Sequence, residues 1–489
     1  MPPISFTRIP SLKTVEAFGA HVRTLGIDLR FEPQISVGDA SALRRSFQWQ
    51  GRTIGNRWAV HPMEGWDATR TGGVTETMLR RWQRFGESGA KLIWGGEAMA
   101  VRPDGRANPN QLILNEANKA GIAGLRESLL KAHREKHGRS DDVIIGFQLT
   151  HSGRFCRPRD HKRNEPRVAF RHPILDKKFH VTGDAQVFTD DELKRLTDDY
   201  IAAARVAADI GADFVDVKHC HGYLLHELLA AHTRPGPYGG SLENRTRLFR
   251  DIVAGIRAET PKLEIGVRLS AFDLVPFKPD PTAAEPGKLG PGVPEDFSHC
   301  LPYRYAFGVN QNNPVEYDLA EPIQFLHMLE GLDIQLVNLS AGSPYYNPHI
   351  QRPAIYPPSD GYQPPEDPLV GVARQINVVK ALKALFPKLI IVGTAYSYLQ
   401  EYLPRVAEYY VRHGHVDVVG LGRVVLSYPA MLADATSQGK IEPRWVCRTF
   451  SDCTTAPRNG LRSGCYPLDD YYKNFEDAPK LKQAKKIHP

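Results

Sequence analysis

Cysteine is scarce in this sequence, with six residues among 489. So few thiols in a chain of this length do not make a disulfide framework. No apolar run is long enough to cross a membrane, and the first residues lack the charged and then apolar order of a secretory signal. These absences predict a cytoplasmic protein that makes no contact with a membrane.

A strong excess of one charge is also missing. The chain has 62 basic and 55 acidic residues, a net charge of +7, and the basic residues are scattered. The one local basic run, from Lys480 to Lys486, is typical of a solvated chain end. This balance gives no indication of nucleic-acid binding, and a hydrophobic fraction of 42% is enough for a sizeable core.

Short apolar runs alternate along the chain with segments of helical spacing, which predicts a parallel sheet. Eight runs are predicted to be strands, over residues 58–61, 91–94, 143–149, 213–217, 264–269, 334–339, 389–392 and 416–420. Eight strands that are each followed by a helix close more readily into a barrel than into an open sheet. We therefore predict the α/β class and a (β/α)8 TIM barrel over residues 51–435, with an N-terminal extension over 1–50 and a C-terminal extension over 436–489.

Three long irregular stretches interrupt this alternation, over residues 155–188, 272–313 and 341–369. Each follows a predicted strand, so each is expected to rise from the C-terminal face of the barrel, where barrel enzymes keep their active sites. Irregular loops of this length are typical of functional lids, and we expect lids or subunit contacts here.

The end of the fourth predicted strand carries a cluster of ionisable residues: Lys218, His219, His221 and Tyr223. Such a cluster at the C-terminal end of a barrel strand suits proton transfer or anion binding. Since side chains alternate along extended backbone, Lys218, His221 and Tyr223 are expected to face the pocket and His219 to face away.

The stretch that contains this cluster reads DFVDVKHCHGYLLHELLAAHTRPGPYGGSLENRTR. It resembles the Old Yellow Enzyme and 2,4-dienoyl-CoA reductase family of NADH:flavin oxidoreductases, whose wording is close to H-x-x-[HN]-G-Y-L and Y-G-G-S-x-x-N-R-x-R. The resemblance implies FMN as cofactor, with Lys218 and His221 binding a substrate oxygen and Tyr223 donating a proton. Lys218 departs from the family's histidine. A buried ammonium is costly unless an anion meets it, so we expect an anionic small-molecule substrate.

The resemblance also implies a set of FMN-binding residues. Gln148 can donate and accept along the flavin pyrimidine, and Arg268 would meet the charge of the reduced flavin. Small residues in two late loops would let backbone N–H groups approach the phosphate, which an arginine also binds. The predicted cofactor residues are Pro62, Met63, Glu64, Ala98, Gln148, Arg268, Gly393, Thr394, Gly422 and Arg423.

Two positions depart from relatives in that family. Glu64 stands where relatives have Thr or the Cys that tethers FMN, so no such tether is expected. Its carboxylate either lies near flavin N5 and makes the flavin harder to reduce, or turns toward Lys218 or Arg268. Iron–sulfur members carry C-x2-C-x3-C-x11-C, whereas this chain has Cys447-x5-Cys453-x11-Cys465. One thiolate is missing, so we predict a lost cluster and no metal site.

No G-x-G-x-x-G motif follows any predicted strand, so NADH or NADPH is expected to enter the substrate's own pocket. The favoured prediction is NAD(P)H-dependent reduction of an activated C=C bond on FMN. A second hypothesis is FMN-dependent oxidation of a substrate, as in amine dehydrogenases and demethylases. A third is a metal-dependent barrel hydrolase that uses His151, His219 and His221.

Overall fold

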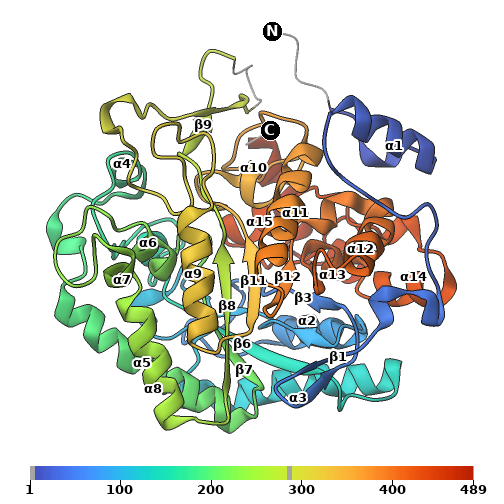
Figure 1. Cartoon of the computed structure of the whole chain (residues 1–489), viewed down its shortest axis with the longest axis horizontal. Coiled ribbons are helices and arrows are strands. Elements are labelled where there is room, and N and C mark those ends of the chain that lie inside the picture. The colour runs from blue at the N-terminus through green and yellow to red at the C-terminus, as the bar shows by residue number, and fades with distance from the viewer. Residues whose placement is uncertain (1–5, 284–288, 488–489) are drawn as a thin grey trace.

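The computed structural model describes residues 6–283 and 289–487, and its centre is a closed parallel barrel (Figure 1). Neighbouring barrel strands pair in parallel, and the β4–β6 and β13–β3 pairings close the ring. The eight strands in spatial order are β3 (Trp58–Val60), β4 (Leu92–Ile93), β6 (Ile144–Thr150), β7 (Phe214–Val217), β8 (Glu264–Ser270), β11 (Leu336–Ser340), β12 (Ile390–Gly393) and β13 (Val418–Leu421). Each overlaps a strand predicted from the sequence, and the TIM-barrel prediction is confirmed.

Helices surround the barrel and connect its strands. The principal ones are α2 (Glu76–Glu87), α3 (Lys119–His137), α5 (Asp190–Ile210), α8 (Arg247–Glu259), α9 (Ala320–Gly331), α11 (Pro368–Leu385), α12 (Leu403–Arg412), α13 (Arg423–Ser427) and α14 (Met431–Gln438). Helix α5 begins at a capping box, in which Thr189 accepts from the Glu192 N–H and the Glu192 carboxylate accepts from the Thr189 N–H. This cap fixes where the chain enters the helix that leads to β7, the strand whose end carries Lys218.

The N-terminal end of the barrel is filled with apolar side chains. Phe214 packs edge-on against Trp94 and against Trp49 of an antiparallel hairpin, β1 (Phe47–Trp49) and β2 (Arg52–Ile54). Gly146 makes room for the Phe214 ring, since a Cβ there would lie 2.3 Å from it. These contacts close the N-terminal end of the barrel with a small apolar cluster. The hairpin and the short strand β5 (Ala98–Ala100), which pairs with β6, were not predicted.

The long loops rise on the side to which the β8 arrow points in Figure 1. They contain α4 (Leu175–Phe179), the hairpin of β9 (Phe277–Pro279) and β10 (Gly292–Pro294), and α10 (Pro348–Gln351). The chain ends in α15 (Asp452–Arg458), α16 (Asp470–Lys473) and α17 (Ala478–Ile487). In the part of the chain that the structure describes, no helix is long and apolar enough to cross a membrane. The division at residues 50 and 435 stays a prediction.

Candidate active site

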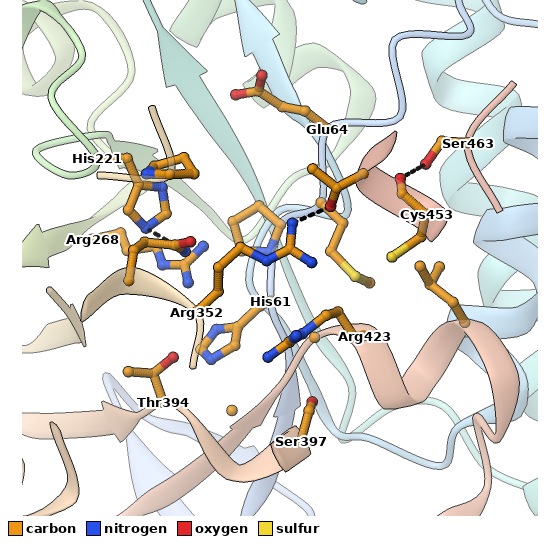
Figure 2. A pocket seen from close by; sticks show the side chains of 18 of the residues that line it. His61, Glu64, His221, Arg268, Arg352, Thr394, Ser397, Arg423, Cys453 and Ser463 are labelled. Atoms are coloured by element: carbon orange, nitrogen blue, oxygen red, sulfur yellow. Dashed lines mark hydrogen bonds between the residues drawn. The ribbon is translucent and has the colours of Figure 1, made fainter. Parts of the chain in front are cut away.

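A cavity of about 230 Å³ opens at the C-terminal ends of the barrel strands (Figure 2). It is lined by most of the residues that the sequence predicted for the site: Pro62, Met63, Glu64, Gln148, Lys218, His221, Tyr223, Arg268, Thr394, Gly422 and Arg423. Two predicted cofactor residues, Ala98 and Gly393, are not part of this lining. Ala98 lies beside Gln148 on β5, where its carbonyl accepts from Gln111, and Gly393 directly precedes Thr394.

Glu64 is held at one end of the cavity by three donors. Its Oε1 lies 2.8 Å from the Lys218 ammonium, and its Oε2 accepts from the Tyr223 hydroxyl at 2.7 Å and from the Trp66 indole at 2.9 Å. The Lys218 and Glu64 side chains are only 4% and 13% exposed. Of the two interpretations left open by the sequence, the structure supports the one in which Glu64 turns toward Lys218.

Tyr223 lies inside the same group of contacts. The Lys218 ammonium lies 3.7 Å from the centroid of the Tyr223 ring. The hydroxyls of Tyr223 and Tyr345 lie 2.9 Å apart. Burial and the neighbouring Glu64 charge raise the pKa of Tyr223 well above its usual value. Tyr223 is therefore a protonated phenol, and its hydroxyl donates a hydrogen bond to Glu64.

His221 adopts a left-handed backbone conformation with φ of 67°, which turns the chain out of β7. Its backbone N–H donates to the Ser270 hydroxyl at 3.0 Å, and its Nε2 lies 3.0 Å from the Ser340 hydroxyl. Burial, with the charges of Arg268 and Lys218, lowers the pKa of His221 well below its usual value. His221 is a neutral imidazole at this site.

His219 and His151 face elsewhere. The His219 ring packs against Phe249 and Phe325, as the alternation of side chains predicted. His151 accepts from the Gly153 N–H and packs against the Phe188 ring. The three histidines of the hydrolase hypothesis thus point into different surroundings and do not share a site.

A buried carboxylate that the sequence prediction missed fixes Gln148. Asp216, on β7, accepts from the Gln148 amide nitrogen at 2.6 Å and from the Trp94 indole at 2.7 Å. Its other oxygen accepts from the Arg268 backbone N–H at 2.7 Å, and burial raises the pKa of Asp216 to about 6. Since Asp216 takes the amide nitrogen, the carboxamide oxygen of Gln148 remains to accept from a ligand.

Three arginines also line the cavity: Arg268, Arg352 and Arg423. Among residues 6–283 and 289–487, none of them forms a salt bridge with a carboxylate. Arg352 donates to the hydroxyls of Thr454 and Ser451, and Arg423 donates to the Pro353 carbonyl at 3.1 Å. The Nε of Arg268 and the Nη1 of Arg423 are buried without a hydrogen-bond partner in the described chain.

One of these cations acts on another. Burial, and then the nearby Arg423 guanidinium, lowers the pKa of Arg352 to about 9. Figure 2 shows the side chains of Arg352 and Arg423 extending into the space bordered by His61, Thr394 and Cys453. A side chain at Gly422 would meet no atom within 4 Å, so this loop borders open space. Buried cations without anions are unfavourable, and the arrangement is suited to an anionic ligand.

Arg352 and several other lining residues were not identified from the sequence. Arg352 and Tyr345 belong to the loop over 341–369, while Cys453, Arg458 and Ser463 belong to the C-terminal extension. The only signal in the sequence was the length of that loop, which predicted a lid without saying which side chain would reach the pocket.

Cys447, Cys453 and Cys465 lie around a small cavity that also contacts Arg423 and Leu426. All three are free thiols, and burial raises the pKa of Cys447 and Cys465 above the usual value. In the described residues, no group of three or more His, Cys, Asp or Glu side chains is arranged to hold a metal ion.

Part of the chain matches a known family. Residues 46–289 match the model of the NADH:flavin oxidoreductase / NADH oxidase family. An NADH:flavin oxidoreductase of Gibberella zeae is 30% identical over 238 residues, which are 46% of this chain and 55% of that protein. An NADPH dehydrogenase of Clostridium acetobutylicum is 30% identical over 222 residues, covering 45% of this chain and 60% of that protein. The chain therefore spans little more than half the length of these relatives.

A solved structure supports the same fold. The Old Yellow Enzyme homologue from Zymomonas mobilis superposes with a TM-score of 0.54 at 21% identity. The match covers 83% of this chain and 97% of that one. At this level of identity, the likeness establishes the barrel architecture and nothing about the substrate.

Proposed function

Because this chain belongs to the NADH:flavin oxidoreductase / NADH oxidase family, we propose that it is an FMN-dependent enzyme that uses NADH or NADPH to reduce an activated C=C bond. The observation that carries the proposal is the group of three cavity arginines without described carboxylate partners, next to the carboxamide of Gln148. Use of a nicotinamide reductant fits the cytoplasmic location that the sequence predicts.

The residues present fit FMN. Arg423, Thr394 and Gly422 would hold its phosphate, with Arg352 as a second arginine, and a phosphate carries about two negative charges. Gln148 and Arg268 would meet the pyrimidine ring, and the backbone from Pro62 to Glu64 would border the flavin, as the family resemblance implies. FMN bound there supplies hydride transfer, which no side chain can provide.

Lys218 and His221 would bind the substrate's carbonyl oxygen. An ammonium has three N–H donors, and Glu64 accepts from one of them. A neutral imidazole has one N–H, so when the Ser340 hydroxyl donates to Nε2 of His221, the N–H lies on Nδ1 and would be offered to the substrate. Two donors on one oxygen draw electron density from the conjugated double bond, which prepares its β-carbon to accept a hydride.

Tyr223 would deliver the proton to the α-carbon. Its hydroxyl must first turn away from Glu64, with which it now shares a hydrogen bond of 2.7 Å. The Tyr345 hydroxyl at 2.9 Å is placed to pass a replacement proton to Tyr223. Tyr223 therefore acts as general acid with Tyr345 behind it.

The same hydrogen bond favours a second candidate function, the oxidation of a substrate. A phenol that donates to a carboxylate is set up to pass on a proton taken from a substrate N–H or O–H. This arrangement suits the amine dehydrogenase or demethylase type of reaction, in which Tyr223 and Glu64 together form the base.

Anaerobic reduction and re-oxidation separates these candidates. Purified protein is mixed with NADH or NADPH while flavin absorbance is followed, and is then exposed to enones, enoates and N-methylated amines. We expect the nicotinamide to bleach the flavin and an activated alkene to restore it. Bleaching by an amine but by neither nicotinamide would establish the second candidate, and protein that binds no flavin would refute both.

A further inference from the structure

The Glu64 carboxylate forms an ion pair with Lys218, the cation that would face the substrate. We propose that Glu64 sets the charge of the substrate that the cavity accepts, because its ion pair with Lys218 cancels the charge of the ammonium that faces the substrate. The inference rests on the proposed function, in which Lys218 and His221 hold a substrate oxygen. Since Glu64 acts through Lys218, it is a positioning residue for specificity.

The contacts of Glu64 leave it little freedom to move. Lys218, Tyr223 and Trp66 donate to its two oxygens at 2.7 to 2.9 Å. Trp66 has a φ of 52°, a left-handed conformation that bulky residues rarely adopt, and it directs its indole N–H to Glu64. Turning the carboxylate away would leave the buried Lys218 ammonium without its anion, so the ion pair is part of the built pocket.

Lys218 can still bind a substrate oxygen. Its Nζ donates to Glu64 and lies against the Tyr223 ring, and no other acceptor contacts it in the described chain. One N–H therefore remains for a carbonyl in the cavity. Lys218 polarises that carbonyl while the pair as a whole presents no net charge.

A carboxylate in the same place would gain little. It would lie near both Lys218 and Glu64, where attraction and repulsion act over similar distances and largely cancel. The cost of removing the carboxylate from water would remain. We expected an anionic substrate because an unpaired ammonium needs an anion; Glu64 already fills that need, so the geometry points to a neutral carbonyl compound.

Four proteins test the role of Glu64: the wild type, Glu64→Gln, Lys218→Met, and the double variant. For each, kcat/KM is measured with cinnamaldehyde and with cinnamate, which share a carbon skeleton and differ in charge. We expect the cinnamate-to-cinnamaldehyde ratio to rise about 10- to 100-fold in Glu64→Gln, where one positive charge is left unopposed. It should fall in Lys218→Met and return close to the wild-type value in the double variant.

Glu366→Gln is the matched control, because Glu366 pairs with Arg374 at 2.6 Å and does not line the cavity. It removes the same charge and should leave the ratio unchanged. A second readout needs no turnover. Calorimetry gives the dissociation constants of benzoate and benzamide for each of the four proteins. The preference for benzoate over benzamide should rise in Glu64→Gln, fall in Lys218→Met and return close to the wild-type value in the double variant. The specificity effect should therefore appear mainly in KM.

The inference would be overturned if Glu64→Gln kept both ratios within twofold of the wild type: cinnamate to cinnamaldehyde in kcat/KM, and benzoate to benzamide in affinity. A ratio that shifts equally in Glu366→Gln would overturn it as well. If no protein passes a hydride from NAD(P)H to any alkene, the proposed function fails, while the benzoate and benzamide constants still decide the role of Glu64.

Discussion

The two ends of the cavity are built differently. At one end, Glu64 pairs with Lys218 and accepts from Tyr223 and Trp66, so charges and donors are matched within the chain. At the other, Arg352 and Arg423 have no carboxylate partner among the described residues. Removing a charge from water is costly without a partner, so the arginine end needs an anion from outside while the Glu64 end is already complete. We assign the arginine end to the FMN phosphate and the Glu64 end to a neutral substrate.

The largest effect is expected from Tyr223→Phe at the Glu64 end. The variant keeps the ring that contacts Lys218 and removes only the hydroxyl that we propose as the proton donor. General acid catalysis is typically worth about 10²- to 10⁴-fold, so re-oxidation of the reduced enzyme by an alkene should slow by that factor. Stopped-flow absorbance measures this rate and the rate of bleaching by NAD(P)H, which should stay near normal. Equal slowing of both rates would mean that Tyr223 acts through packing.

Arg423→Ala tests the arginine end. A buried, charge-assisted contact with phosphate is worth about 2–3 kcal/mol, so FMN should bind about 30- to 150-fold more weakly. Calorimetric titration with FMN measures the change. Arg374→Ala removes an arginine that pairs with Glu366 away from the cavity and should leave the affinity intact. Undiminished affinity in Arg423→Ala would place the phosphate elsewhere.

Arg352→Ala should have a smaller effect at the same end. Its guanidinium already donates to Thr454 and Ser451, so only part of its hydrogen-bonding capacity is left for a phosphate. We expect FMN to bind roughly 10-fold more weakly, equivalent to about 1.4 kcal/mol. A loss as large as in Arg423→Ala would make the two arginines equal partners, and no loss would remove Arg352 from the phosphate site.

The smallest effect concerns pH. Burial lowers the pKa of His221 well below its usual value, so the imidazole stays neutral as the pH falls through 6.5. The rate constant for alkene reduction should therefore stay level between about pH 8 and pH 6. A titration near pH 6.5 that disappears in His221→Asn would show that His221 is protonated in that range, and the Glu64 end would then carry a charge.

The sequence predicted the barrel well because each strand is a short apolar run buried on both faces. Their places at a strand end allowed Lys218, His221 and Tyr223 to be assigned to one site. The alternation of side chains along the strand predicted that His219 faces away from it. Arg352 could not, because it lies in a long loop whose path depends on Ser451 and Thr454 about one hundred residues later. The direction of Glu64 was equally open, since its partner Lys218 is 154 residues away.

The central claim is that the arginine end binds the phosphate of FMN. The most direct test is calorimetric titration of flavin-free protein with FMN and with riboflavin, which has the same ring system but no phosphate. We predict one FMN site per chain and binding of riboflavin at least about 100-fold weaker, the factor that about 2.7 kcal/mol of phosphate contacts produces. Equal affinities for the two flavins, or no binding of FMN, would contradict the account.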